Sequence, residues 1–232
     1  MQKIEMSRRS FVAGALSVAA LGLLPTSSLA KEKSEAEKVT ANEDLMREHG
    51  VIRRGLLVYR EAAVRLDAHK QVPLEALLDT ARLFKTFAED YHERAVEEKY
   101  VFPEVRKTGG KAADLVDVLY KQHERSREIT AYLLKEIPRA KGGDQVPHIA
   151  QTLQAVDLMY EHHTVREDTV VFPAWKKDIG SKNYEEMGEK FEEIEHRILG
   201  NDGFDEALKK ITRIEAAFGL EDLAKLTAPP PA

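Results

Sequence analysis

Between residues 45 and 66, side chains suited to the buried face of a helix recur at alternating steps of four and three residues. The series is Leu45, His49, Ile52, Leu56, Tyr59, Ala63 and Leu66. This spacing puts every member on one face of an α-helix and is typical of a helix that packs inside a bundle. One position on the otherwise hydrophobic face is a histidine, His49. A polar side chain in such a place needs a bonding partner, so the pattern constrains both the fold and the contents of the core.

Three further segments carry comparable faces. Their core positions are Leu77, Ala81, Phe84, Ala88 and His92; Val116, Leu119, His123 and Leu133; and Ile149, Leu153, Val156, Tyr160, His163, Glu167 and Val170. Proline and glycine separate the segments, and none alternates with a period of two. We therefore expect an all-α chain without a sheet, with helices over about 43–68, 73–108, 111–136 and 145–177. Short links between long helices favour an up-down-up-down four-helix bundle over 43–178.

The bundle is flanked by segments of different character. Residues 31–42 are polar and read as a flexible leader, and 179–232 form a C-terminal extension that ends in a proline-rich tail. Helices are expected there over about 182–198 and 204–218. Their apolar residues need cover, which predicts that they pack on the bundle. These residues are Phe191, Ile194, Ile198, Leu208, Ile211 and Ile214.

The first 30 residues have the pattern of a signal peptide. Positive residues precede an apolar stretch over 11–24, and Ser28-Leu29-Ala30 supplies the small residues of a cleavage site. The run Ser7-Arg8-Arg9-Ser10-Phe11-Val12 resembles a twin-arginine export signal. That resemblance implies export of the folded protein by the twin-arginine machinery, a periplasmic or otherwise exported location, and no stable membrane insertion after cleavage. The alternative is an uncleaved N-terminal anchor.

Composition narrows the chemistry of the core. The formal net charge is -5, so no broad basic surface for nucleic acid is expected. The chain has no cysteine, which excludes disulfides and thiolate metal sites. A metal would have to bind His, Asp, Glu or Tyr.

Each of the four predicted helices places one histidine on its core face, and two helices add a glutamate about one turn later. Any one of these residues, considered alone, is more often a hydrogen-bonded side chain in the core or at its edge than a metal ligand. Together they match the metal sites that di-iron carboxylate proteins build in bundle cores. Imidazole and carboxylate without thiolate suit non-haem iron, with manganese or zinc as competitors. On the fourth helix His163 continues the apolar face, whereas His162 lies about 100° away.

The second and fourth segments resemble each other when their Phe-Pro pairs, Phe102-Pro103 and Phe172-Pro173, are aligned. Glu97 then falls on Glu167, which favours Glu97 over Glu98 as the inward carboxylate. The alternative is that Phe-Pro is only a shared device for ending a helix. His92 and Glu97 are five residues apart, about 140° in an ideal helix, so we predict a π-bulge between them.

These segments resemble the hemerythrin-like (HHE cation-binding) family over roughly residues 40–176. The most specific piece is 163–170 (HTVREDTV), and 43–51 (EDLMREHGV), the two Phe-Pro segments and Gln122-His123 also match. The resemblance implies a bundle with two non-haem irons, bridged by carboxylates and an oxo or hydroxo group. It also implies a set of six ligands: His49, His92, Glu97, His123, His163 and Glu167.

The chain departs from the oxygen-carrying members of that family. They have a fifth histidine on the third helix, where this chain has Leu119 or Arg127, and an aspartate at a different step on the fourth. The set is more similar to the iron-centre repair proteins, which favours open coordination positions. The function implied is binding or sensing of O2, NO or peroxide, or handling of iron. Alternatives are a di-iron enzyme (an oxidase, a peroxide or NO reductase, or a repair factor) and a metal-free interaction module. Tyr160 is expected to serve core packing and His196 to lie at the surface.

Overall fold

The computed structural model describes residues 39–142 and 146–231, so the predicted signal peptide and most of the leader lie outside the described residues. The first long helix is α2 (Ala41–Asp67), and the third is α5 (Gly110–Glu136), which runs into the 3-10 turn η2 (Ile137–Gly142). The second is built from α3 (Leu74–Leu83), η1 (Phe84–Val101) and α4 (Phe102–Thr108). The fourth is built from α6 (Val146–Arg166), η3 (Glu167–Val171) and α7 (Phe172–Ile179). The extension forms α8 (Ser181–Leu199) and α9 (Gly203–Phe218).

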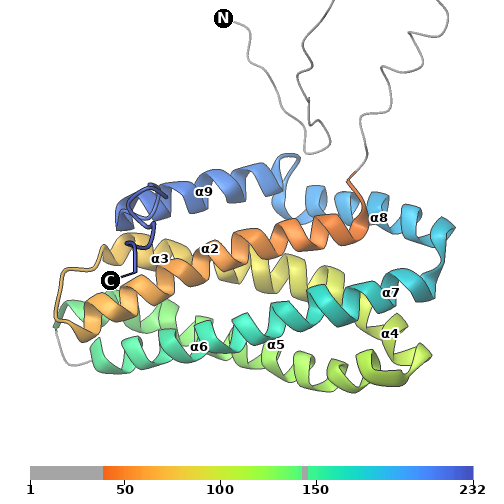
Figure 1. Ribbon diagram of the computed structural model, residues 1–232, viewed down its shortest axis with the longest axis horizontal. Helices are drawn as coiled ribbons and strands as arrows, with labels where there is room; N and C mark the ends of the chain where they lie inside the picture. Colours follow the sequence, from red (N-terminus) through yellow and green to blue (C-terminus); the bar gives the residue numbers. More distant parts are fainter. Residues whose placement is uncertain (1–38, 143–145, 232) are drawn as a thin grey trace, which may run out of the picture.

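The predicted all-α bundle is confirmed: the described ranges contain helices, turns and bends and no strand. Successive long helices run antiparallel, and α2 packs chiefly against α6 along its length (Figure 1). The second helix lies diagonally opposite the fourth, and they meet where α4 touches α7. Helices α8 and α9 form an added layer over α2 and the second helix (Figure 1). Within the described residues, no helix combines the length and apolar character needed to cross a membrane.

The predicted core faces are buried almost throughout, including all seven positions on α2. Two expectations were wrong in detail. Val170 is only half-buried, because the local helix widens after Glu167 and turns Val171 into the core instead. Ile198, near the end of α8, keeps 40% of its surface exposed, so it is not covered by the bundle as expected.

The predicted π-bulge between His92 and Glu97 is confirmed, and it belongs to a longer π-helical segment, η1. A second, shorter π-segment, η3, follows in the fourth helix. Each ends at a Phe-Pro pair, after which an α-helix continues without a break. Phe-Pro is therefore not a helix-ending device here. Proline has no N–H to donate, so it is tolerated where the hydrogen-bond step changes from five residues to four.

Candidate metal centre

The six residues predicted from the sequence meet in the core of the bundle, each at most 3% exposed. His49 and His92 lie side by side with ring centroids 4.7 Å apart, and His123 and His163 form a second pair at the same separation. Glu97 lies between the pairs: its Oε1 is 3.2 Å from His92 Nε2 and its Oε2 is 3.4 Å from His123 Nε2.

Glu167 also faces both histidine pairs. Its Oε2 lies 3.0 Å from His163 Nε2 and 3.4 Å from His49 Nε2. The ligating atoms form two overlapping groups, each within 4.8 Å, that share Glu97. One group contains His49 and His92, and the other contains His123, His163 and Glu167. The arrangement offers two neighbouring cation positions with carboxylates between them.

The other ring nitrogen of each histidine bonds outward to a side chain of a neighbouring helix. His49 Nδ1 lies 2.7 Å from Asp168 Oδ1, and His92 Nδ1 lies 2.7 Å from Glu48 Oε2. These contacts join the fourth helix to the first and the first to the second. Glu48 is itself fixed by a 2.6 Å hydrogen bond from the Tyr91 hydroxyl.

The other two histidines make equivalent outward contacts, which complete the links between neighbouring helices. His123 Nδ1 lies 3.0 Å from Glu98 Oε1, and His163 Nδ1 lies 2.9 Å from Gln122 Oε1. They join the second helix to the third and the third to the fourth. All four partners are acceptors, so each Nδ1 carries the proton and each neutral ring presents a bare Nε2 to the interior. That is the tautomer a metal ion needs.

Several inward atoms have no hydrogen-bond partner in the described part of the chain. They are His92 Nε2 and all four carboxylate oxygens of Glu97 and Glu167. His123 Nε2 and His163 Nε2 face each other at 3.0 Å. Buried polar atoms in native structures are normally paired, and unpaired ionised carboxylates are costly to bury. Cations between these atoms would satisfy all of them, so the residues present fit a metal centre.

The electrostatics of the metal-free site favour positive charge. Burial lowers the pKa of His92, but the carboxylates of Glu97 and Glu48 outweigh it and hold that pKa well above its ordinary value. The pKa of His123 is raised in the same way, to about 9, by its acidic neighbours against the effect of burial. Burial raises the pKa of Glu167, yet the imidazoles of His163 and His49 bring it far below its usual range. In the metal-free protein, protons therefore compete with metal ions for these inward atoms.

Two arginines and two phenylalanines support the histidines from outside. Arg53 donates to Asp168 and Arg127 donates to Glu98, so each carboxylate that holds a histidine is itself held. The Phe172 ring stacks on His49 at 5.4 Å, and the Phe102 ring stacks on His123 at 5.3 Å. The two Phe-Pro pairs thus pack against the site.

Comparison with known proteins agrees with this geometry. The family pattern described as the hemerythrin HHE cation binding domain matches residues 40–175. The chain belongs to this hemerythrin HHE family. Uncharacterized protein Rv1995 of Mycobacterium tuberculosis and Uncharacterized protein Mb2018 of Mycobacterium bovis are each 44% identical to it over 191 residues, which is 82% of this chain and 74% of theirs. No solved structure matches the chain significantly.

The sequence distinguished correctly between neighbouring residues of this HHE domain. His163 is buried whereas His162 is exposed, and Glu97 faces inward whereas Glu98 bonds to the outer nitrogen of His123. His196 is 43% exposed and pairs with a residue of its own helix. Tyr160 is buried, 5.8 Å from the His163 ring, and its hydroxyl is also bonded, so it does more than fill space.

The outer partners of the histidines were not anticipated as such. Glu98 was considered only as a rejected metal ligand, and the other partners, Asp168, Glu48 and Gln122, had no role assigned. Each of the four is the chain neighbour of a candidate ligand. A polar residue next to a candidate ligand in the sequence could therefore have indicated an outer partner. The sequence does not indicate which neighbouring helix that residue contacts.

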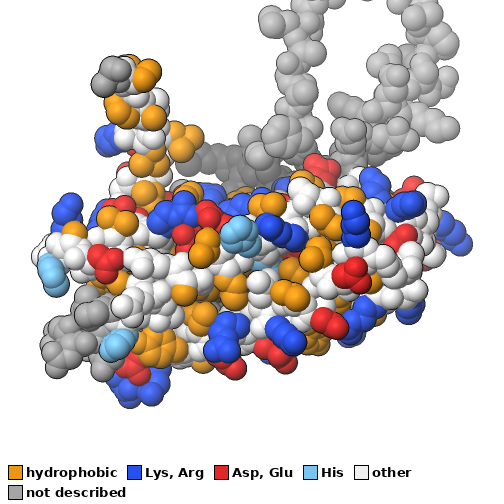
Figure 2. Space-filling model, turned by 60° about the horizontal axis from the view of Figure 1, so that its bottom comes forward, with side chains coloured by type: hydrophobic (Ala, Val, Ile, Leu, Met, Phe, Trp, Pro, Cys, Tyr) orange, Lys and Arg blue, Asp and Glu red, His pale blue; other side chains and the backbone are white. Residues whose placement is uncertain are grey.

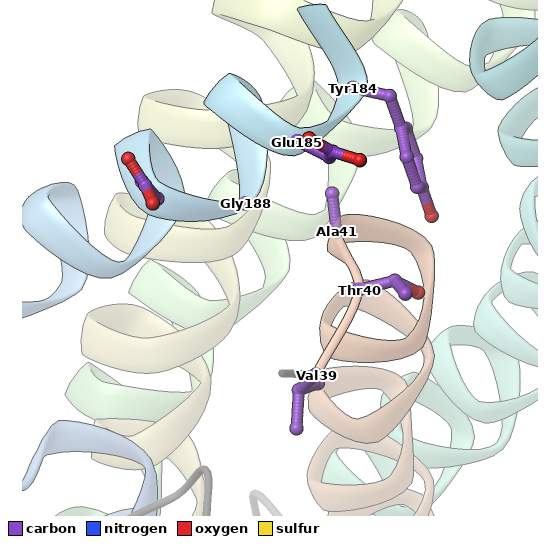
Figure 3. Close-up of a pocket in the computed structure, with 7 residues that line it drawn as sticks. Val39, Thr40, Ala41, Tyr184, Glu185 and Gly188 are labelled. Atoms are coloured by element: carbon purple, nitrogen blue, oxygen red, sulfur yellow. The ribbon is translucent and has the colours of Figure 1, made fainter. Parts of the chain in front are cut away.

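Two hollows at the surface of the described structure lie away from the buried centre. A pocket of about 160 Å³ lies between the start of α2 and α8, lined by Ala41, Tyr184 and Gly188 among others (Figure 3). An open groove of about 530 Å³ lies between α2 and α6 and includes Arg53 and Arg60. On the face drawn in Figure 2, hydrophobic, basic and acidic side chains intermingle rather than form one patch of a single kind.

Proposed function

We propose that this protein holds two non-haem iron ions between its four long helices. One ion would be bound by His49 and His92 and the other by His123 and His163. Glu97 and Glu167 would bridge them. The observation that carries the proposal is the convergence of four bare Nε2 atoms on two carboxylates whose oxygens have no other partner in the described chain.

The donor set supports iron. Nitrogen and carboxylate oxygen without sulfur suit non-haem iron, and they also admit manganese or zinc. Two imidazoles and two bridging carboxylate oxygens leave part of the coordination sphere of each ion open. Bound iron would supply redox chemistry and a place for a small ligand. The chain's own contribution is to orient the imidazoles, fix their tautomers and exclude bulk water, since the candidate ligands are almost fully buried.

We propose further that the centre binds or senses O2, NO or peroxide. The open positions and the absence of a fifth histidine favour this over simple reversible oxygen carriage. The second candidate is a di-iron enzyme, such as a peroxide or NO reductase or an iron-centre repair factor. The buried acidic groups beside the site favour it, because reduction of an oxygen ligand consumes protons. Turnover in the presence of a reductant separates the two.

Metal analysis of protein purified without added iron tests the central claim. We expect about two iron ions per chain and an optical spectrum with oxo-bridged ferric bands. The variants Glu167→Ala and His163→Ala should lose metal, whereas His162→Ala, at the exposed neighbouring position, should keep it. Purified protein free of iron, manganese and zinc would overturn the proposal. Retention of two ions by Glu167→Ala would exclude its bridging role.

We also propose that the protein is exported in folded form by the twin-arginine route. This rests on residues 1–30 of the sequence alone. Replacing both Arg8 and Arg9 by lysine should leave the protein in the cytoplasm in cell fractionation. Export of that double variant at the normal level would exclude this route.

A further inference from the structure

Large hydrophobic side chains gather on one exposed face of the bundle, beside α2 and α6. The described residues leave nine such side chains exposed, and six of the nine belong to this face. The two on each helix are seven residues apart, so they share one side of it. Helices α2 and α6 run side by side, and the chain ends close to α2 (Figure 1). A concentration of this kind marks an interaction surface. The six are Leu57 and Val64 on α2, Leu158 and Val165 on α6, and Leu223 and Leu226 after α9.

Two grooves on this face have Leu57 and Arg60 in common. The first, of about 530 Å³, lies between α2 and α6 and includes Arg166. The second, of about 590 Å³, lies between α2 and the residues after α9 and includes Glu221. Leu57 and Arg60 therefore lie in the middle of the face, with one groove on each side of them.

The charges of the two grooves are balanced. Four arginines and four glutamates line them, so this face carries no net charge although the whole chain carries -5. Six of the eight are already in ion pairs within the chain. These are Arg53, Arg54, Arg60, Glu61, Glu161 and Glu215. The other two, Arg166 and Glu221, form no ion pair with any residue in the described ranges. They have opposite signs, and one lies in each groove.

This distribution of charge is complementary to itself under a two-fold rotation. If two copies meet face to face with the axis through Leu57, the first groove of each copy lies over the second groove of the other. Arg166 of each copy then meets Glu221 of the other, and the two Leu57 side chains pack together. Contacts between identical surfaces around a two-fold axis are the commonest kind in protein oligomers.

We propose that this face binds a second copy of the chain in that two-fold arrangement. A surface of anionic lipid fits the face less well, because the four glutamates would lie against the negative headgroups. A strongly acidic or basic partner also fits less well, because the face has no excess of either charge. The contact does not depend on the proposed metal function, since none of the six candidate ligands lines either groove.

Sedimentation of the purified protein tests the contact. We expect twice the mass of one chain. Leu57→Asp should weaken the dimer at least about 100-fold, because it buries two carboxylates against each other at the axis. Leu57 is 49% exposed in the single chain, so this variant should fold. Val118→Asp is the matched control, because Val118 is 53% exposed but lies on α5 and in neither groove, and this variant should remain dimeric.

Three results of these measurements would overturn the proposal. The first is a wild type that remains monomeric up to a concentration of about 100 μM. The second is Leu57→Asp with the dissociation constant of the wild type. The third is binding of the monomer to vesicles of phosphatidylserine and phosphatidylcholine that Leu57→Asp abolishes, which would assign the face to a membrane.

An exchange of charges tests the two-fold arrangement itself. Arg166→Glu and Glu221→Arg each place like charges opposite each other, so each should weaken the dimer about 10-fold. The double variant restores opposite charges across the contact and should return to within about 3-fold of the wild type. Arg166 and Glu221 lie in separate grooves of one chain, so this rescue requires the second copy. A double variant as weak as the two losses combined would exclude the arrangement.

Discussion

Replacing Asp168 by alanine removes the carboxylate that holds His49 in place. Asp168 bonds to His49 Nδ1 at 2.7 Å and is clamped from outside by Arg53. Loss of such an outer partner typically costs about 10- to 100-fold in metal affinity. This corresponds to about 1.4 to 2.8 kcal/mol of binding free energy. The loss arises because His49 is no longer fixed in its metal-binding tautomer and orientation.

The chain offers a matched control on the same face. Asp157 on α6 also bonds across to an arginine of α2, with Arg60 Nε 2.9 Å from its Oδ2, and it touches no candidate ligand in the described structure. The two arginines are similarly exposed, at 41% for Arg53 and 47% for Arg60, so each ion pair contributes about 1 kcal/mol or less to folding. Asp157→Ala should therefore lose some stability but keep the metal affinity of the wild type.

Competition with a chromophoric chelator measures the affinities, and thermal unfolding of the metal-free variants measures their stabilities. In the chelator assay we expect Asp168→Ala to bind metal more weakly than Asp157→Ala. Asp168→Ala should also unfold more easily without metal, because a buried N–H left without an acceptor costs about 1 to 3 kcal/mol. If Asp168→Ala bound metal as tightly as the wild type, or if Asp157→Ala lost as much affinity, the inferred role of Asp168 would be wrong.

Two further predictions concern stability. A methyl group on Gly55 would lie 2.6 Å from Phe84 Cε2, so Gly55→Ala should cost about 1 to 3 kcal/mol of unfolding free energy in denaturant titrations. Gly50→Ala, on the same helix with nothing within 4 Å of the new methyl, should be neutral or stabilising; equal losses would contradict the packing argument. The pKa of His123 in the metal-free protein is raised from 6.5 to about 9, so its stabilising effect is complete below pH 6.5 and is lost as pH rises through 9. Metal-free protein should lose up to about 3 kcal/mol across this window, and a flat profile would contradict it.

The faces of the helices were predictable because helical periodicity is a local property. Steps of four and three place His49 and His163 on buried faces, and both are buried. The five-residue step from His92 to Glu97 correctly predicted a π-segment, since an α-helix would turn one of them away. No such spacing predicted η3. The candidate ligands of the fourth helix are four residues apart, so they share a face in an ordinary α-helix without a π-segment.

What the sequence could not supply was contact between helices. Glu98 and Glu48 each lie next to a candidate ligand in the chain, but each bonds to the histidine of the following helix. The periodicity of one helix predicts which of its side chains face the core. It does not predict which side chain of another helix each of them contacts.

With the partners known, the centre proves to be built twice from one pattern. In α2 and in α5 an arginine follows the histidine by four residues, and in both cases it clamps the acid that holds that histidine. These arginines are Arg53 and Arg127. The sequence had marked the position of Arg127 only as one that cannot bind metal. The repeated Phe-Pro segments of the second and fourth helices have their counterpart here in the first and third.

The two halves differ in the outer partner of one histidine each, and this difference should make the two metal ions unequal. The residue before the first histidine is Glu48, which holds His92, whereas the residue before the third is Gln122, which holds His163. An imidazole bonded to a carboxylate is a more basic ligand than one bonded to an amide. The His92 side of the centre should therefore bind iron more tightly, and a metal titration should show two steps. Gln122→Glu replaces the amide by a carboxylate of the same shape and should bring the steps together. Equal steps in the wild type, or steps unchanged by that substitution, would mean that the outer hydrogen bonds do not set the affinity of each ion.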